Sequence, residues 1–278
     1  MKRRFDQLDV FSATALGGNP LAVVHAAQGL DDARMAAFAS WTNLSETSFL
    51  LPPTAPGADY RVRIFTPGGE LPFAGHPTLG SCYAWLAAGG TPQAAGRVVQ
   101  QCGIGLVRLR RDGNALAFEA PALRCEPADD ALLQPVCAAL GLQRAQLRAA
   151  SWLDNGPRWL ALLLDSAAAV LAVRPDHARL KTLAKVGLVG PQPTGADTAF
   201  EVRAFASMLG VDEDPVTGSL HAGLAQWLID LGHAPTRYVA AQGAALGRAG
   251  RVRLERDDDG RIWVGGEVTP CIRGEVEL

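Results

Sequence analysis

Two short segments of the sequence share a pattern that could hold an anionic ligand. Residues 76–81 read His-Pro-Thr-Leu-Gly-Ser and residues 214–219 read Asp-Pro-Val-Thr-Gly-Ser. Proline is tolerated in the first turn of a helix, so we expect His76 and Asp214 at the cap positions of two helices. The free N–H groups of a helix start attract anions. The two segments therefore predict helix starts that face each other across a cleft and bind a carboxylate or a developing enolate.

The side chains at these helix starts have both functional and ordinary explanations. A helix start disfavours a charged imidazole, so His76 is expected to be neutral and available for hydrogen bonding. An isolated histidine is more often structural, and capping alone could explain Asp214. Gly75 and the Thr-Gly-Ser segment at 217–219 would let backbone donors approach a ligand closely.

Two further candidates lie upstream of the first segment. Glu46 stands in Leu-Ser-Glu-Thr, between a helix expected to end near Thr42 and an apolar strand. The composition of the sequence does not distinguish Glu46 from an ordinary surface glutamate in a turn. Gly-Gly-Asn-Pro at 17–20 is also an ordinary turn sequence, and its alternative role is to place Asn19 beside a ligand.

The elements that must position these residues occur twice along the chain. Val-Arg-Ile-Phe at 62–65 and Val-Arg-Ala-Phe at 202–205 precede the two segments, and helix-like runs at 79–88 and 220–231 follow them. Alternating strand-like residues come next in both halves. Because the first helix is apolar on nearly every face, it is expected to be buried inside strands that wrap around it.

Composition limits the classes of partner. The chain has 278 residues, 48% of them hydrophobic, and a formal net charge of −2 with both signs interspersed. This predicts two domains and no nucleic-acid or membrane binding, so a small molecule is the expected partner. The five cysteines lack the paired short spacings of a metal or redox site. Carboxylates occur near the N-terminus, where a signal peptide needs an apolar run, and every apolar stretch is too short to cross a membrane. We therefore expect a cytoplasmic protein.

The sequence resembles the PhzF-like isomerases of phenazine biosynthesis, which share the diaminopimelate-epimerase fold. The resemblance covers nearly the whole chain and rests on specific motifs. These are Gly-Asn-Pro-Leu-Ala-Val-Val at 18–24, Asn-Leu-Ser-Glu-Thr at 43–47, Arg-Ile-Phe-Thr-Pro at 63–67, Glu-Leu-Pro-Phe-Ala-Gly-His-Pro-Thr-Leu-Gly at 70–80, Glu-Asp-Pro-Val-Thr-Gly-Ser at 213–219, Gln-Gly at 242–243 and Gly-Arg at 247–248.

The resemblance implies an α+β fold of two pseudo-symmetric lobes, each a β-barrel-like sheet around a central helix. The N-terminal lobe is expected at 1–124 and the C-terminal lobe at 125–278, with the strand near 265–278 able to return to the first lobe. The family is often dimeric and needs no cofactor, so we expect a homodimer without cofactor or metal.

The resemblance also implies roles for individual residues. Glu46 would shuttle a proton on a small carboxylate-bearing substrate, while His76 and Asp214 orient the polar groups of that substrate. The remaining expected substrate-binding residues are Asn19, Gly75, Thr78, Gly218 and Ser219.

Two other functions stay open from the sequence. Related racemases and epimerases use one cysteine at each helix start, whereas this chain has Gly75 and Asp214 there and Cys82 farther into the helix. A single carboxylate moves a proton on one face, which favours isomerisation over inversion of a stereocentre. A non-catalytic small-molecule-binding protein on the same fold is the other alternative.

Overall fold

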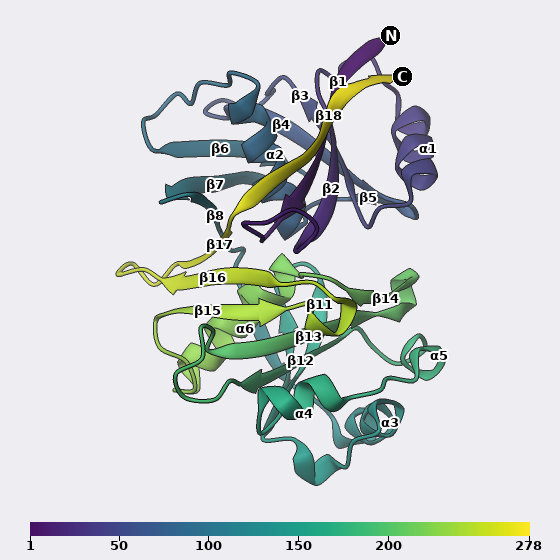
Figure 1. Cartoon of the computed structure of the whole chain (residues 1–278), viewed down its shortest axis with the longest axis vertical. Helices are drawn as coiled ribbons and strands as arrows, with labels where there is room; N and C mark the ends of the chain where they lie inside the picture. Colours follow the sequence, from purple (N-terminus) through teal and green to yellow (C-terminus); the bar gives the residue numbers. More distant parts are fainter. The chain divides into compact units, whose positions relative to one another are not determined.

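The computed structural model describes residues 1–278 and has a mixed α/β fold that is rich in strands and has few helices (Figure 1). Internal contacts divide the chain into two compact units. Unit 1 comprises Met1–Glu119 with Gly265–Leu278, and unit 2 comprises Ala120–Val264. The C-terminal segment therefore belongs to unit 1, together with the N-terminal residues.

In unit 1, most strands pair with the next strand along the chain. β1 pairs antiparallel with β2 and with β18, β2 runs parallel to β3, and β3 pairs antiparallel with β4. β4 pairs antiparallel with β5 and parallel with β6, and the hairpins β6–β7 and β7–β8 follow. The elements are β1 (Lys2–Val10), β2 (Asn19–Val24), α1 (Asp32–Thr42), β3 (Thr47–Leu51), β4 (Tyr60–Thr66), β5 (Gly69–Leu71), α2 (Gly75–Ala87), β6 (Arg97–Cys102), β7 (Gly105–Asp112), β8 (Ala115–Glu119) and β18 (Val268–Glu277).

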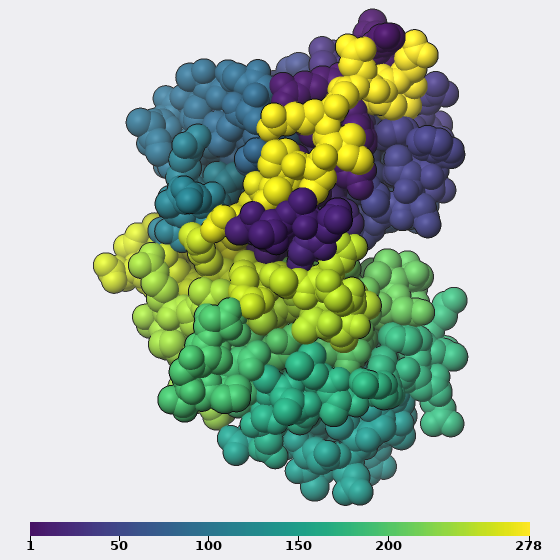
Figure 2. All heavy atoms as spheres, viewed as in Figure 1, coloured from purple at the N-terminus to yellow at the C-terminus, as the bar shows by residue number.

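β18 closes unit 1 by pairing along the whole length of β1, with a register shift between Gln7 and Leu8. Most of its residues are exposed, and Figure 2 shows them on the surface beside the N-terminal residues. The two ends of the chain thus lie on neighbouring antiparallel strands.

Unit 2 repeats this order of pairing. β10 pairs antiparallel with β9 and β11, β11 runs parallel to β12, and β12 pairs antiparallel with β13. β13 then pairs with β14 and, in parallel, with β15, which forms a hairpin with β16. The elements are β9 (Arg124–Pro127), α3 (Asp130–Leu140), η1 (Arg144–Gln146), β10 (Ala149–Asp154), β11 (Arg158–Leu163), α4 (Ala167–Ala172), α5 (His177–Leu180), β12 (Val186–Pro191), β13 (Phe200–Ala206), η2 (Ser207–Leu209), β14 (Val211–Asp214), α6 (Gly218–Asp230), β15 (Arg237–Gln242), η3 (Ala244–Leu246) and β16 (Gly250–Arg256). The remaining strand, β17 (Ile262–Gly266), begins in unit 2, and its last two residues belong to unit 1.

The repeated Val-Arg-x-Phe sequence lies on β4 and β13, which occupy the same place in the two orders of pairing. The helices that follow, α2 and α6, are each thirteen residues long and mostly buried, as their apolar sequences predict. α3 was not expected from the sequence. It begins at Asp130 with Asp129 as its cap, and the Asp129 side chain accepts a hydrogen bond from the backbone N–H of Ala131.

The expected cap positions of the two helices are wrong. α2 begins at Gly75 with Ala74 as its cap, so His76 lies inside the first turn. α6 begins only at Gly218 with Thr217 as its cap, so Asp214 lies at the end of β14. The physical reason in unit 2 is Gln242, whose amide bonds the carbonyl of Asp214 and the N–H of Thr217 and so holds the intervening residues as a loop.

The turn between β1 and β2 depends on a close backbone approach at Gly18. A Cβ atom built there would lie 2.1 Å from the carbonyl oxygen of Val10. The N–H of Gly18 also donates to the Asp9 carboxylate at 2.7 Å. Only glycine fits this contact, and the turn leads directly into Asn19 and Pro20 at the start of β2.

Replacing Gly18 by alanine should therefore destabilise the protein by about 1–3 kcal/mol, because the obstructing atoms are backbone and cannot rotate away. Urea unfolding followed by circular dichroism measures this. Gly274→Ala is the matched control, since a Cβ there meets nothing within 4 Å, and it should change stability by less than about 0.5 kcal/mol. Equal effects of the two substitutions would contradict the assignment.

Candidate active site

The structure of unit 1 brings Glu46 and His76 together. Glu46 immediately precedes β3, and His76 lies in the first turn of α2. The Nε2 atom of His76 and the Oε2 atom of Glu46 are 3.5 Å apart. The His76 side chain is 4% exposed and the Glu46 side chain 16% exposed. The pair is therefore shielded on most sides, with access left at the carboxylate.

The hydrogen of the His76 ring can be assigned from its surroundings. Burial lowers the pKa of His76 to about 3, although a hydrogen bond to the Pro20 backbone opposes the shift. Proline has no N–H, so the ring must donate to the Pro20 carbonyl. Because Nε2 is buried without a hydrogen-bond partner, the donor is Nδ1. The neutral ring therefore presents the Nε2 lone pair toward Glu46.

Burial rather than the helix dipole is thus the main reason that His76 is neutral. A neutral imidazole with a free lone pair is a hydrogen-bond acceptor, and the lowered pKa of His76 makes it a poor base. It can accept a hydrogen bond from a protonated Glu46 or from an O–H or N–H of a bound molecule.

Two other predicted residues of unit 1, Asn19 and Thr78, are buried and have defined hydrogen-bond partners. Asn19, at the start of β2, is fully buried, and its Oδ1 lies 3.4 Å from the hydroxyl of Ser45, the neighbour of Glu46. The Thr78 hydroxyl donates to the Ala74 carbonyl at 2.9 Å and accepts from Gln100 at 3.0 Å. These bonds fasten the start of α2 to β6, so Thr78 supports the helix start, and its contact with substrate stays a prediction.

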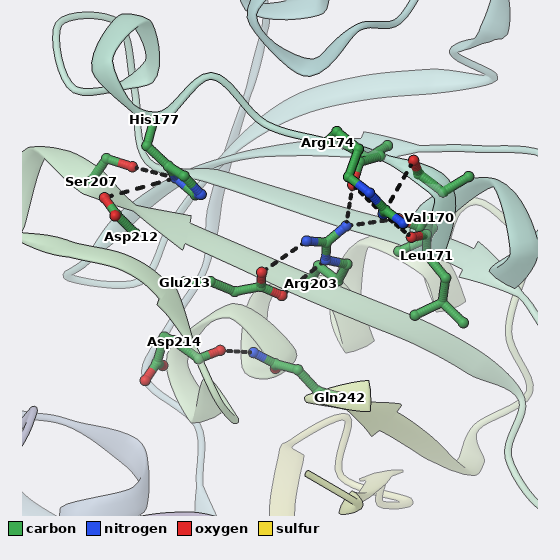
Figure 3. Close-up of polar contacts among 12 residues, drawn as sticks. Val170, Leu171, Arg174, His177, Arg203, Ser207, Asp212, Glu213, Asp214 and Gln242 are labelled. Carbon is green, nitrogen blue, oxygen red and sulfur yellow. Dashed lines mark hydrogen bonds and ion pairs between the residues drawn. The ribbon is translucent and has the colours of Figure 1, made fainter. Parts of the chain in front are cut away.

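In unit 2, the carboxylate of Asp214 is held by a buried amide. Oδ2 of Asp214 accepts from the Thr217 hydroxyl at 2.5 Å. Nε2 of Gln242 donates to that hydroxyl at 3.0 Å. It also donates to the Asp214 carbonyl at 2.8 Å, the contact drawn in Figure 3. The other end of the amide is also occupied. Oε1 of Gln242 lies 3.0 Å from both the Thr217 N–H nitrogen and Nε2 of His221. The orientation of Asp214 is therefore fixed by neighbours inside unit 2.

Ser219 lies in the first turn of α6 and also has defined partners. The indole N–H of Trp159 donates to its hydroxyl at 3.1 Å, and Nδ2 of Asn155 donates to its carbonyl at 2.8 Å. Neither α6 nor α2 has a hydrogen bond from a capping side chain. The helices that begin at Gly75 and Gly218 therefore have no side-chain caps. Backbone N–H groups at such helix starts are suited to binding an anion.

A buried ion pair anchors the strand that carries Asp214. Arg203 on β13 forms two hydrogen bonds with Glu213, at 2.9 and 2.8 Å, and Figure 3 shows Glu213 beside Asp214 on β14. Arg203 also donates to the carbonyls of Val173 and Val170. Four hydrogen bonds of the guanidinium thereby reach partners, two to the carboxylate and two to backbone carbonyls, which compensates much of the cost of burying the charge.

Unit 1 contains an equivalent arginine–glutamate ion pair that is more exposed. Arg63 on β4 forms a bidentate pair with Glu70 and also bonds Asp32. Its partners are 42% and 82% exposed, whereas Arg203 and Glu213 are 5% and 8% exposed. The sequence repeat thus preserves an arginine–glutamate pair, but only the copy beside Asp214 is buried.

The cysteines do not occupy the helix starts. Cys82 is fully buried within α2, and burial raises the pKa of its thiol to about 12. No group of three or more histidine, cysteine, aspartate or glutamate side chains is arranged to hold a metal ion. No helix is both long and apolar enough to cross a membrane.

Comparison with known proteins places the chain in a family. A model of the phenazine biosynthesis-like proteins, PhzC-PhzF, matches residues 8–274. The chain belongs to this family. The resemblance inferred from the sequence motifs is therefore confirmed.

Similar sequences span nearly the whole chain. Antisense-enhancing sequence 1 of Schizosaccharomyces pombe is 35% identical, and the match covers 98% of this chain and 97% of that protein. Trans-2,3-dihydro-3-hydroxyanthranilate isomerase of Pseudomonas aeruginosa is 34% identical over 92% of this chain and 91% of its own length. Other relatives in the family are also named isomerases.

Solved structures agree with the fold. A PhzF-family protein of Bacillus anthracis has a TM-score of 0.87 at 20% identity, with full coverage of both chains. A probable proline racemase of Agrobacterium radiobacter has a TM-score of 0.64 at 14% identity, covering 99% of this chain and 93% of that one. The fold is thus a mixed one that is also found in proline racemase-like proteins.

The predicted site residues form two groups, one in each unit. Glu46, His76 and Asn19 lie close together in unit 1, and Asp214 and Ser219 belong to networks in unit 2. That both groups act on one substrate stays a prediction. The sequence predicts no role for Arg203, Gln242 or Trp159, although Arg203 lies in the repeated Val-Arg-x-Phe sequence and Gln242 in the Gln-Gly motif.

Arg203→Met should destabilise the protein by about 3–5 kcal/mol, because it leaves the Glu213 carboxylate buried without its partner. Arg63→Met should cost about 1 kcal/mol or less, since its carboxylate partners can be hydrated. Urea unfolding of the two variants measures the difference. Similar losses for both would show that burial of the Arg203 pair is not energetically important.

Proposed function

We propose that this protein is a cofactor-independent isomerase that moves a proton on a small carboxylate-bearing substrate, with Glu46 as the only acid/base. The observation that carries the proposal is the Glu46–His76 pair, in which a partly accessible carboxylate faces the lone pair of a neutral imidazole at 3.5 Å. Membership of a family with several named isomerases supports the reaction class.

In the proposed reaction, the Glu46 carboxylate takes a proton from a carbon of the substrate, and the electron pair delocalises over its conjugated system. The protonated carboxyl then returns this proton to another carbon of the same system, and the double bond moves accordingly. No atom or electron is gained or lost. A single carboxylate can perform both steps when the two carbons lie on the same face.

His76 would orient the substrate in this scheme. Its Nε2 lone pair can accept an O–H or N–H hydrogen, while the Pro20 carbonyl keeps the Nδ1 hydrogen in place. Between the two steps, the same lone pair can accept a hydrogen bond from the protonated Glu46. Asp214 would bind another polar group, and Ser219 with the helix starts would bind the substrate carboxylate.

For the substrate, we propose a cyclic, partly unsaturated carboxylate. Three relatives between 32% and 35% identical bear the name trans-2,3-dihydro-3-hydroxyanthranilate isomerase. That compound is an appropriate first assay substrate for this chain. We further propose that the units are pseudo-symmetric barrel-like lobes, an arrangement that the repeated order of strand pairing supports, and that the protein works as a cytoplasmic homodimer.

A racemase or epimerase is the second candidate. A solved structure named a predicted epimerase, from Pseudomonas aeruginosa, is 31% identical with a TM-score of 0.81. Two-thiol chemistry would need reactive cysteines at both helix starts. Residues 74–76 and 217–219 contain none, and burial raises the pKa of the Cys82 thiol to about 12. The isomerase is therefore the better supported function.

Glu46→Gln should lower turnover of trans-2,3-dihydro-3-hydroxyanthranilate by about 1,000-fold or more, because the amide cannot accept a proton from carbon. Binding of substrate should remain within a few-fold of the wild type, since glutamine keeps the size of the side chain. NMR of the reaction in D₂O and calorimetric titration measure the two effects.

Glu277→Gln, at an exposed position on β18, is the matched control and should leave turnover unchanged. Substantial activity of Glu46→Gln on a substrate that the wild type turns over would show that another group moves the proton. Inversion of a stereocentre without movement of a double bond would favour the epimerase.

A further inference from the structure

Lys185 occupies the position in unit 2 that Glu46 occupies in unit 1. Glu46 immediately precedes β3, which runs parallel to β2 and pairs Thr47 with Ala22. Lys185 immediately precedes β12, which runs parallel to β11 and pairs Val186 with Leu160. In each unit, the residue before this parallel strand lies near a residue in the first turn of the buried helix. Glu46 contacts His76 directly, and Lys185 is linked to Ser219 through Trp159.

The surroundings of Lys185 connect it to Ser219. Its Nζ atom lies 5.0 Å from the centre of the Trp159 ring, and Nε1 of the same indole donates to the Ser219 hydroxyl. Trp159 itself is buried. One aromatic side chain therefore carries the ammonium on its face and the serine hydroxyl at its edge.

The ammonium lacks an anionic partner within the protein. Lys185 is partly buried, and the structure contains no ion pair between it and a carboxylate within 4.0 Å. Asp154 is the nearby acidic group, but its carboxylate accepts from the N–H of Gly156 and lies 3.8 Å from Arg124. Burial lowers the pKa of Lys185, and Asp154 only opposes this effect. Cation desolvation is costly unless a negative charge approaches.

A second polar atom in the same group is also unpaired. Asn155, which bonds the Ser219 carbonyl through Nδ2, is 7% exposed, and its Oδ1 is buried without a hydrogen-bond partner. Buried acceptors normally find a donor, so this unpaired oxygen, on a side chain that bonds the Ser219 carbonyl, supports completion of the group by a donor of a bound ligand.

We propose that Lys185 is a substrate-recognition residue whose ammonium binds the carboxylate of the substrate together with the Ser219 hydroxyl. The proposal rests on the proposed function, because it names the group that recognises the charge of that substrate. Glu46 and Lys185 then have different tasks at equivalent positions.

The test compares two probes that differ in one carboxylate. 3-Hydroxyanthranilate carries an aromatic carboxylate, and 2-aminophenol is the same ring without it. Lys185→Met keeps the apolar stem against Trp159 but removes the charge. It should weaken binding of 3-hydroxyanthranilate by about 10- to 100-fold and leave binding of 2-aminophenol unchanged, as measured by calorimetric titration.

Two variants serve as controls. Lys185→Arg should retain most of the affinity for 3-hydroxyanthranilate, because it retains the positive charge. Lys181→Met removes an exposed lysine four residues earlier and should bind both probes like the wild type, which separates a local contact from the net charge of unit 2.

The proposal is overturned if Lys185→Met binds 3-hydroxyanthranilate like the wild type or loses both probes equally. It is also overturned if the wild type shows no preference for the carboxylate-bearing probe. Its failure is distinguishable from failure of the proposed function, because the latter is decided by turnover of Glu46→Gln. If Glu46→Gln abolishes turnover but Lys185→Met binds both probes like the wild type, only the proposal for Lys185 is rejected.

Discussion

The chemistry available to unit 1 depends on the burial of a single imidazole. His76 cannot take up a second proton near neutral pH because its surroundings do not hydrate the cation, and its one hydrogen is committed to the Pro20 carbonyl. The Nε2 lone pair is consequently directed at Glu46. The close packing of Gly18 on Val10, which shapes the turn before Pro20, contributes to this arrangement. Backbone geometry and side-chain protonation are thus linked.

Unit 2 uses hydrogen bonds and ion pairs to achieve comparable rigidity. Gln242 satisfies both ends of its buried amide on the loop around Asp214 and on α6, and Arg203 holds the adjacent Glu213. Each of these polar groups would be costly to bury alone, so the network is stable only when all members are in place. A carboxylate held in this way needs little reorganisation when a ligand binds, which is the property that a binding residue requires.

The sequence predicted the family, the strand-rich fold, the buried helices and the internal repeat, because these depend on apolar periodicity and on motifs that occur twice. It did not predict where the helices begin, since the start of α6 is set by Gln242, a residue on a distant strand. The neutral state of His76 was expected, but its main cause is tertiary burial. Lys185 has no local signal at all, because its position becomes meaningful only when β11 and β12 are paired.

The measurement that tests this account most directly is the ¹⁵N NMR spectrum of the His76 ring, assigned by comparison with His76→Asn. The account predicts a neutral ring between pH 5 and pH 8, with a protonated Nδ1 and an unprotonated Nε2, because the pKa of His76 is lowered to about 3. A ring that is doubly protonated in this range, or that carries its hydrogen on Nε2, would contradict the assignment of a lone pair facing Glu46.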